Sequence, residues 1–138
     1  MLGVTADTNI YISGLEFGGL PRRFLDLARA GVFRLDISEA ITQEVLRVLR
    51  DKFNYSPDVL RSVEGKLVDI THHVTPVQTV DVIKIDPTDN RIVECAIAAR
   101  SDFIVSGDVR HVLPVGSYEG IQIVKVADFL ELLKQPQA

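Results

Sequence analysis

The apolar residues of this chain fall into short continuous runs, separated by longer segments in which apolar positions recur every three or four residues. Compact β-branched runs are typical of strands that are buried on both faces. Such runs occupy residues 2–6 (LGVTA), 33–37 (FRLDI), 102–106 (DFIVS) and 121–125 (IQIVK). The stretch VQTVDVIKI (77–85) predicts a further extended segment, although Pro76 makes its start less regular.

The segments between these runs carry helical periodicity. Pro21 opens one of them and Gly31 closes it, and Ser38 is a typical N-cap for the next. The segment 56–70 predicts one helix or a pair of helices, because Gly65 weakens it. Helices are therefore expected at residues 21–31, 38–53, 56–70, 89–100 and 126–134.

Strands and helices thus alternate along the chain, which favours an α/β fold with a mostly parallel central sheet flanked by helices. The length of 138 residues is expected to form one domain, residues 1–138. No apolar run approaches the ~20 residues that a membrane helix needs. The N-terminus lacks the features of a signal peptide, and we expect a cytoplasmic protein without membrane association.

The net charge and the cysteine content limit the functions that this protein could have. The net charge of −4 argues against a protein that wraps duplex DNA, which usually has a strong basic excess. Nucleic-acid binding remains compatible with this charge if bound metal neutralises part of the acidic groups. The single cysteine, Cys95, excludes an internal disulfide and lies in an apolar helical pattern. We expect it to be a buried structural thiol.

Two aspartates follow predicted strands. Asp7 comes directly after the first strand, and Asp108 follows the run 102–106 after one glycine. Ligands of parallel α/β sheets gather beyond the carboxyl ends of the strands, so both carboxylates are expected to face one crevice. Each aspartate could instead have a local structural role. Asp7 could cap a helix starting near Ile10, and Asp108 could be a turn residue.

Three further carboxylates lie on predicted helices. Glu44 lies at the margin of an apolar stripe, where it could contribute to a site or pair with Arg47 at i+3. Asp89 is a candidate N-cap of its helix. Glu94 lies among apolar residues, which leaves open a ligand role or an ion pair with Arg91 or Arg100.

Several carboxylates at one edge of a sheet require a counter-charge. Two of them about 5 Å apart repel by roughly 3 kcal/mol at an effective dielectric of 20. Oxygen ligands without a nearby histidine or cysteine select Mg²⁺ or Mn²⁺ over zinc. The pattern therefore predicts a divalent cation among these side chains.

The order of these motifs resembles the PIN-domain family. The resemblance rests on D-T-N near the N-terminus, T-x-E-V-L in an early helix, D-P-T-D-N-R-I-V-E-C-A, and D-F-I-V-S-G-D. It extends from about Val4 to Val126 and is closest to the branch described as toxin components of toxin–antitoxin systems. It implies a three-layer α/β fold and an endoribonuclease that depends on Mg²⁺ or Mn²⁺.

Carried over by position, the resemblance implies that Asp7, Glu44 and Asp108 are metal ligands and catalytic residues. Eighteen residues before Asp108, where many relatives have an aspartate, this chain has Asn90. The neighbouring Asp89 or Glu94, one turn further on, could supply the missing carboxylate. The resemblance further implies polar residues that orient ligands or water. Arginines and lysines of the chain are candidates for contacts with RNA phosphates, although a solvated surface explains most of them equally well. We assign the first role to Asn9, Asn90 and Ser106, and the second to Arg47 and Arg110.

The expected substrate is single-stranded or looped RNA, and the resemblance implies a cognate antitoxin and a homodimer as partners. Another possibility is a PIN-like regulatory or interaction module whose metal site has decayed, for which Asn90 is the main sequence argument. Phosphohydrolases that form an aspartyl phosphate need a second aspartate two residues after the first, where this chain has Asn9. A receiver domain needs paired acids after the first strand, and only Asp7 is present there.

Overall fold

The computed structural model describes residues 1–80, 89–107 and 112–135. In these residues six strands form a single sheet with the order β3-β2-β1-β4-β6-β5. Neighbouring strands are parallel except for β5 and β6. The strands are β1 (Gly3–Ala6), β2 (Arg34–Ser38), β3 (His72–Val74), β4 (Phe103–Val105), β5 (Ser117–Tyr118) and β6 (Ile121–Val124).

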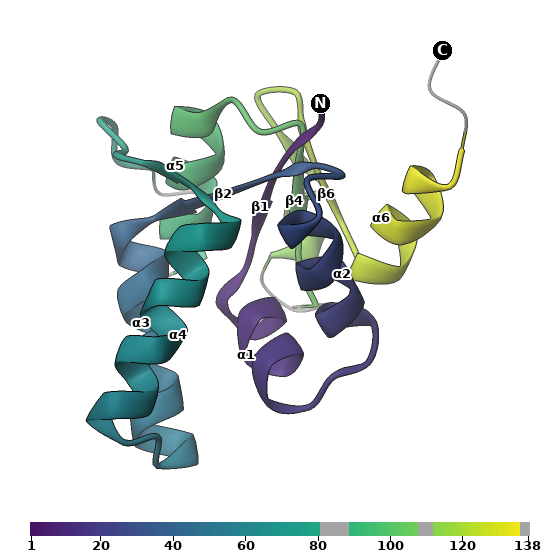
Figure 1. Cartoon of the computed structure of the whole chain (residues 1–138). Helices are drawn as coiled ribbons and strands as arrows, with labels where there is room; N and C mark the ends of the chain where they lie inside the picture. Colours follow the sequence, from purple (N-terminus) through teal and green to yellow (C-terminus); the bar gives the residue numbers. More distant parts are fainter. Residues whose placement is uncertain (81–88, 108–111, 136–138) are drawn as a thin grey trace.

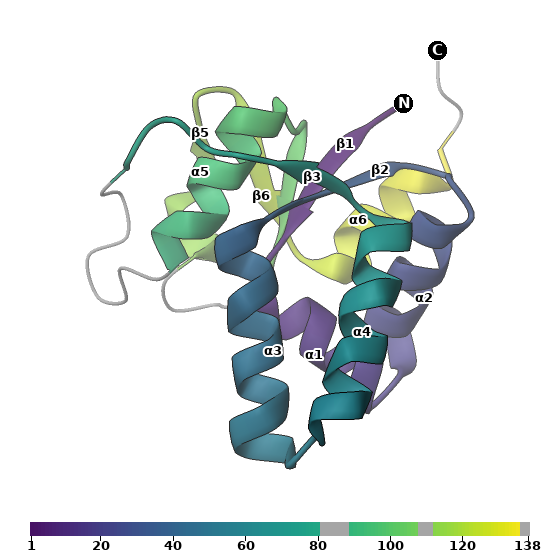
Figure 2. The same cartoon turned by 60° about the vertical axis from the view of Figure 1, so that its left-hand side comes forward.

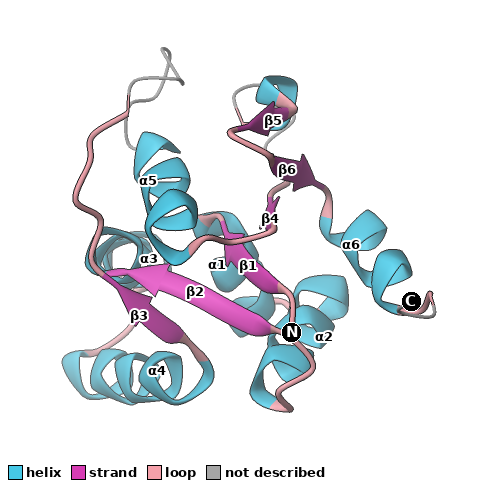
Figure 3. Ribbon diagram, turned by 90° about the horizontal axis from the view of Figure 1, so that it is seen from above, coloured by secondary structure: helices cyan, strands magenta, loops and turns pink. Residues whose placement is uncertain are grey.

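Helices cover both faces of this sheet, which confirms the expected three-layer α/β fold (Figures 1 and 3). Helix α5 lies over one face, and α2 and α4 lie over the other (Figure 3). None of the helices in the described part of the chain is long and apolar enough to span a membrane. The helices are α1 (Thr8–Glu16), α2 (Gly19–Arg29), α3 (Glu39–Phe53), α4 (Pro57–Ile70), α5 (Asn90–Ala99) and α6 (Val126–Leu133), with a short 3-10 helix η2 (Leu113–Val115).

The extended segment predicted at residues 77–85 is not observed as a strand in the described residues. Residues 77–80 of the predicted run 77–85 form no strand, and residues 81–85 lie outside the described residues. The edge strand on the side of β2 away from β1 is instead β3, His72–Val74. It precedes Pro76, which has no backbone N–H to donate to a sheet. The segment 56–70 is a single helix, α4, with Gly65 in its interior.

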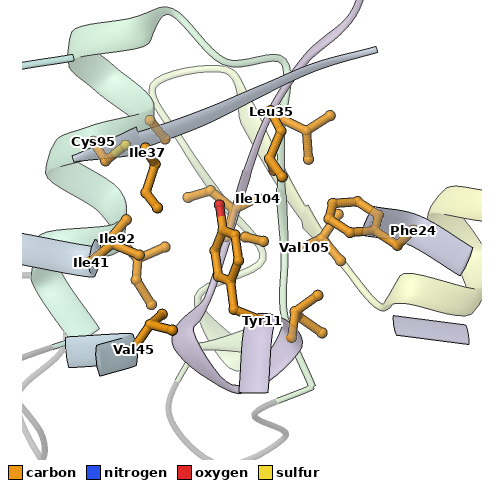
Figure 4. Close-up of a cluster of buried hydrophobic side chains, with 14 of the residues drawn as sticks. Tyr11, Phe24, Leu35, Ile37, Ile41, Val45, Ile92, Cys95, Ile104 and Val105 are labelled. Carbon is orange, nitrogen blue, oxygen red and sulfur yellow. The ribbon is translucent and has the colours of Figure 1, made fainter. Parts of the chain in front are cut away.

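Two helices leave the carboxyl edge of the sheet side by side. Helix α1 follows β1 and α3 follows β2, and both run away from the sheet in the same direction (Figure 2). Ser38 caps α3 as predicted, because its side chain accepts a hydrogen bond from the Ile41 N–H. Helix α1 is anchored by Tyr11, whose ring is fully buried among residues of the sheet, α3 and α5 (Figure 4).

Burial raises the pKa of two of these core side chains, Tyr11 and Cys95. The Tyr11 hydroxyl has no hydrogen-bond partner among the described residues, and burial raises its pKa well above the ordinary value. Burial also raises the pKa of the Cys95 thiol to about 12. Cys95 is therefore a protonated thiol in the core at neutral pH, which confirms the structural role expected for it.

A buried ionic network joins β2, β3 and the connection between α5 and β4. Asp36 of β2 is fully buried and accepts two hydrogen bonds from Arg34, at 2.6 and 3.1 Å. The Ser101 hydroxyl donates to it at 2.7 Å, and Nδ1 of His72 on β3 lies 3.1 Å away. Arg34 also donates to the Ala99 carbonyl, and its hydrogen bond with Asp36 raises the pKa of the guanidinium. The network therefore ties β2 to β3 and to the residues that precede β4.

Candidate active site

Asp7 is held rigidly where β1 ends. Its backbone N–H donates to the Val105 carbonyl of β4 at 3.0 Å, and its side chain is 3% exposed. One carboxylate oxygen accepts from the Ile10 N–H at 3.1 Å, so Asp7 is the N-cap of α1, the local alternative considered from the sequence. The other oxygen accepts a hydrogen bond from the Ser106 hydroxyl.

These contacts give Asp7 a fixed orientation at the carboxyl edge of the sheet. A carboxylate has about four acceptor positions, so the two hydrogen bonds are compatible with an additional role as a cation ligand. Ser106 is fully buried directly after β4, and the contact exists because β1 and β4 are parallel neighbours. Asn9 belongs to the first turn of α1.

A cavity of about 340 Å³ lies where α1, α3 and the start of α5 meet, and its wall includes Thr8, the residue after Asp7. Its wall includes Asn9, Glu44 and Asp89 from the predicted site, together with the predicted RNA contact Arg47. The remaining wall residues are Thr8, Ala40, Ile41, Val48, Lys52, Arg91 and Ile92. Three elements that are distant in sequence thus contribute polar side chains to one cavity.

Glu44 forms an ion pair on the cavity wall. Arg47 donates to both of its carboxylate oxygens, at 3.0 and 2.6 Å, as the i+3 spacing allowed. A weaker contact joins Arg47 to Asp51 at 3.6 Å. Hydrogen bonding to Glu44 raises the pKa of Arg47. The Glu44 side chain is 32% exposed, so solvent and solutes can reach it.

The three predicted site residues at the start of α5 differ in their burial and in their contacts. Asp89 occupies the N-cap position of α5, but its side chain makes no capping hydrogen bond to this helix. Asn90, the first residue of α5, is 1% exposed. Glu94 is 6% exposed and forms an ion pair with Arg91 at 2.7 Å, which was one of the two roles considered for it. Its carboxylate also accepts from the Val80 N–H at 2.9 Å.

The contacts of Glu94 predict a structural contribution. Glu94→Ala is expected to lower the free energy of unfolding by about 2 kcal/mol, because it leaves the Val80 N–H without its acceptor. Glu94→Gln keeps a carbonyl acceptor and should cost less than about 1 kcal/mol. Urea unfolding followed by circular dichroism measures both values. Equal, small losses for the two variants would contradict the assigned contact, and weaker Mn²⁺ binding by Glu94→Gln would instead indicate a ligand.

Two residues of the predicted site cannot be placed. Asp108 and Arg110 lie outside the described residues, so the predicted meeting of Asp7 and Asp108 stays a prediction. Within the described residues no group of three or more His, Cys, Asp or Glu side chains is close enough to hold a metal ion.

The sequence interpretation missed two features near this site. Arg91 is part of the cavity wall, although it was considered only as a partner for Glu94. Asp36 was not singled out, yet it is the most deeply buried carboxylate described. A signal for it exists, since Arg34 and Asp36 are two residues apart in a strand and therefore project from the same face.

Comparison with known proteins gives a family assignment. The family described as "PIN domain" matches residues 4–110, which include the whole candidate site. A search of curated proteins gave no significant match. PIN domains are in general nucleases that use divalent metal ions and act on RNA or DNA. With its three-layer fold and a match over most of its length, this chain belongs to the PIN domain family.

Proposed function

We propose that this protein is an endoribonuclease that depends on Mg²⁺ or Mn²⁺ and hydrolyses phosphodiester bonds in single-stranded or looped RNA. The observation that carries the proposal is a cavity whose wall contains Glu44 and Asp89 and includes Thr8, the residue that directly follows the fixed carboxylate of Asp7. The same wall contains Arg47, Lys52 and Arg91, which supply positive charge for phosphate groups. Family membership supports a nuclease in general.

The donor chemistry of the cavity fits a hard divalent cation. Its described wall offers carboxylate and amide oxygens and contains neither histidine nor cysteine. We assign Asp7 and Asp108 as direct ligands of the cation, and Glu44 and Asp89 would complete its shell directly or through water, with Glu94 as the alternative contributor. When bound, such a cation would activate the attacking water and offset negative charge that develops on the phosphate.

The protein's own residues would provide orientation and charge. Ser106 and the first turn of α1 keep the Asp7 carboxylate in one position, which reduces the reorganisation needed during the reaction. Lys52 and Arg91 would attract the phosphate backbone to the cavity. Arg47 would contribute as well, and its bidentate contact with Glu44 keeps its guanidinium at the cavity wall.

We further propose the biological setting that accompanies this activity. The chain would form a single PIN-like domain over residues 1–138 and act in the cytoplasm as the toxin of a toxin–antitoxin pair. A cognate antitoxin and a second copy of the chain would be its protein partners. A short gene for a DNA-binding protein immediately upstream would support this setting.

Metal removal tests the enzymatic proposal. Protein treated with EDTA and then dialysed should cleave a fluorescent single-stranded RNA at least about 100-fold more slowly than protein supplied with Mn²⁺, because the water is no longer activated. Added Mn²⁺ should restore cleavage, and calorimetry should detect its binding. Cleavage that persists without divalent cations would overturn the proposal.

A specific observation favours a second candidate, an interaction module without catalytic activity. Asn90 stands where many relatives have an acidic residue, and Glu44 is bound by Arg47 in the structure. An interaction module of this kind would neither bind Mn²⁺ nor cleave RNA under any of the conditions above. The same experiment therefore separates the two functions.

A further inference from the structure

An exposed aromatic pair lies where α1 and α3 end. Phe17 follows the last residue of α1, and its side chain is 72% exposed, more than any other aromatic side chain described. Its ring lies 5.8 Å from that of Phe53, the last residue of α3, with an angle of 72° between the ring planes. This edge-to-face contact holds Phe17 in place while most of its surface remains open to solvent.

The pair is connected to the candidate active site by the two helices that carry it. Helix α1 has Thr8 and Asn9 in the cavity wall and ends seven residues beyond Asn9, a rise of about 10 Å. Helix α3 runs beside it and carries Glu44 and Lys52 in the same wall (Figure 2). The aromatic pair is thus within reach of a short single strand that occupies the cavity.

The charge between the cavity and the aromatic pair suits an anionic chain. Lys52 directly precedes Phe53 and is exposed, and no carboxylate of the described residues forms an ion pair with it. Glu16, the acidic neighbour of Phe17, accepts a hydrogen bond from the Tyr55 hydroxyl. A ligand with planar apolar groups and a negative backbone therefore matches this surface better than an uncharged apolar ligand does.

We infer that Phe17, supported by Phe53, is a stacking surface for a base of single-stranded nucleic acid whose backbone passes Lys52 on its way to the cavity. This inference rests on the proposed nuclease function, and it adds a base-binding position outside the catalytic cavity. Stacking of this kind tolerates every base, because each has a flat π-face. The surface therefore contributes affinity and register without sequence specificity.

A tryptophan reporter tests stacking directly, because the chain contains no tryptophan. Phe17→Trp should show saturable fluorescence quenching when a single-stranded 2′-O-methyl RNA is titrated in EDTA, where cleavage cannot occur. Val68→Trp is the matched control, since Val68 is 70% exposed on α4 and should report no stacking. Absence of quenching in Phe17→Trp, or equal quenching in both variants, would overturn the inference.

Affinity gives a second readout of the same surface. Phe17→Ala and Phe17→Leu should each bind the oligonucleotide about tenfold more weakly than the parent, whereas Phe17→Tyr should bind like it. Light scattering on the same samples records the oligomeric state. If Phe17→Ala converts a dimer into a monomer and Phe17→Leu binds normally, the surface contacts a second copy of the chain and the inference is wrong.

The outcomes separate this inference from the proposed function. A parent protein that cleaves RNA with Mn²⁺ while Phe17→Ala binds normally would overturn only the stacking surface. A parent that never cleaves, although Phe17→Trp is quenched, would overturn only the nuclease. Each result thus assigns failure to one of the two statements.

Discussion

Asp7→Asn is expected to reduce RNA cleavage by more than about 100-fold while leaving the fold intact. A neutral amide binds a divalent cation far more weakly than a carboxylate does. Loss of residues that only support metal ligands already costs about 10–100-fold in affinity or activity, and a direct ligand should cost more. Cleavage of the fluorescent RNA and calorimetric Mn²⁺ binding measure the two effects.

The structure explains why this variant should still fold. Asparagine is as good an N-cap as aspartate, and its carbonyl oxygen can accept the Ile10 N–H. The free energy of unfolding should therefore change by less than about 1 kcal/mol. Asp102→Asn is a matched control, because the Asp102 carboxylate accepts a backbone hydrogen bond from Gly3 at the opposite end of β1. Equal cleavage by the two variants would exclude Asp7 from catalysis.

Asp36→Ala is expected to lower the free energy of unfolding by about 3 kcal/mol. Removing one partner of a buried ion pair typically costs 3–5 kcal/mol, and the lower value applies because the Arg34 side chain is 34% exposed and can be hydrated. The substitution also leaves the Ser101 hydroxyl without the acceptor that it has at 2.7 Å. Guanidinium unfolding followed by circular dichroism measures this loss.

A surface ion pair provides the control for this prediction. Asp26 and Arg29 lie 3.7 Å apart on α2, with side chains that are 60% and 73% exposed. Asp26→Ala should change the free energy of unfolding by less than about 0.5 kcal/mol, because such pairs are screened by water. If Asp36→Ala is no more destabilising than Asp26→Ala, the network does not stabilise the sheet.

Most of the fold could be predicted from local patterns. The run 33–37 predicted β2, observed at Arg34–Ser38, because its apolar residues Phe33, Leu35 and Ile37 recur with the two-residue period of a strand. The edge strand β3 was missed because its first two residues, His72 and His73, are exposed. Its pairing with β2 uses backbone groups, which every residue has, so the side chains of an edge strand give little indication of it.

The parts of the candidate site that could be predicted are contacts between residues a few positions apart in the sequence. The i+3 relation indicated the pair of Glu44 with Arg47, and helix capping by Asp7 was the alternative to the metal-ligand role predicted for it. The hydrogen bond from Ser106 to Asp7 joins residues 99 positions apart, and it depends on the parallel pairing of β1 with β4. The burial of Asp36 likewise depends on Ser101, which is 65 positions away.

By itself, the sequence determined helices α2 to α6, strands β1, β2, β4 and β6 and the α/β class of this protein, because these depend on the pattern of apolar residues within a few turns of chain. The tertiary structure alone decided that Asn9, Glu44 and Asp89 share a cavity, that Glu94 turns to Arg91 and Val80, and that Phe17 meets Phe53. These contacts depend on how helices and strands pack, and distances between elements are fixed by the whole core and by no single segment.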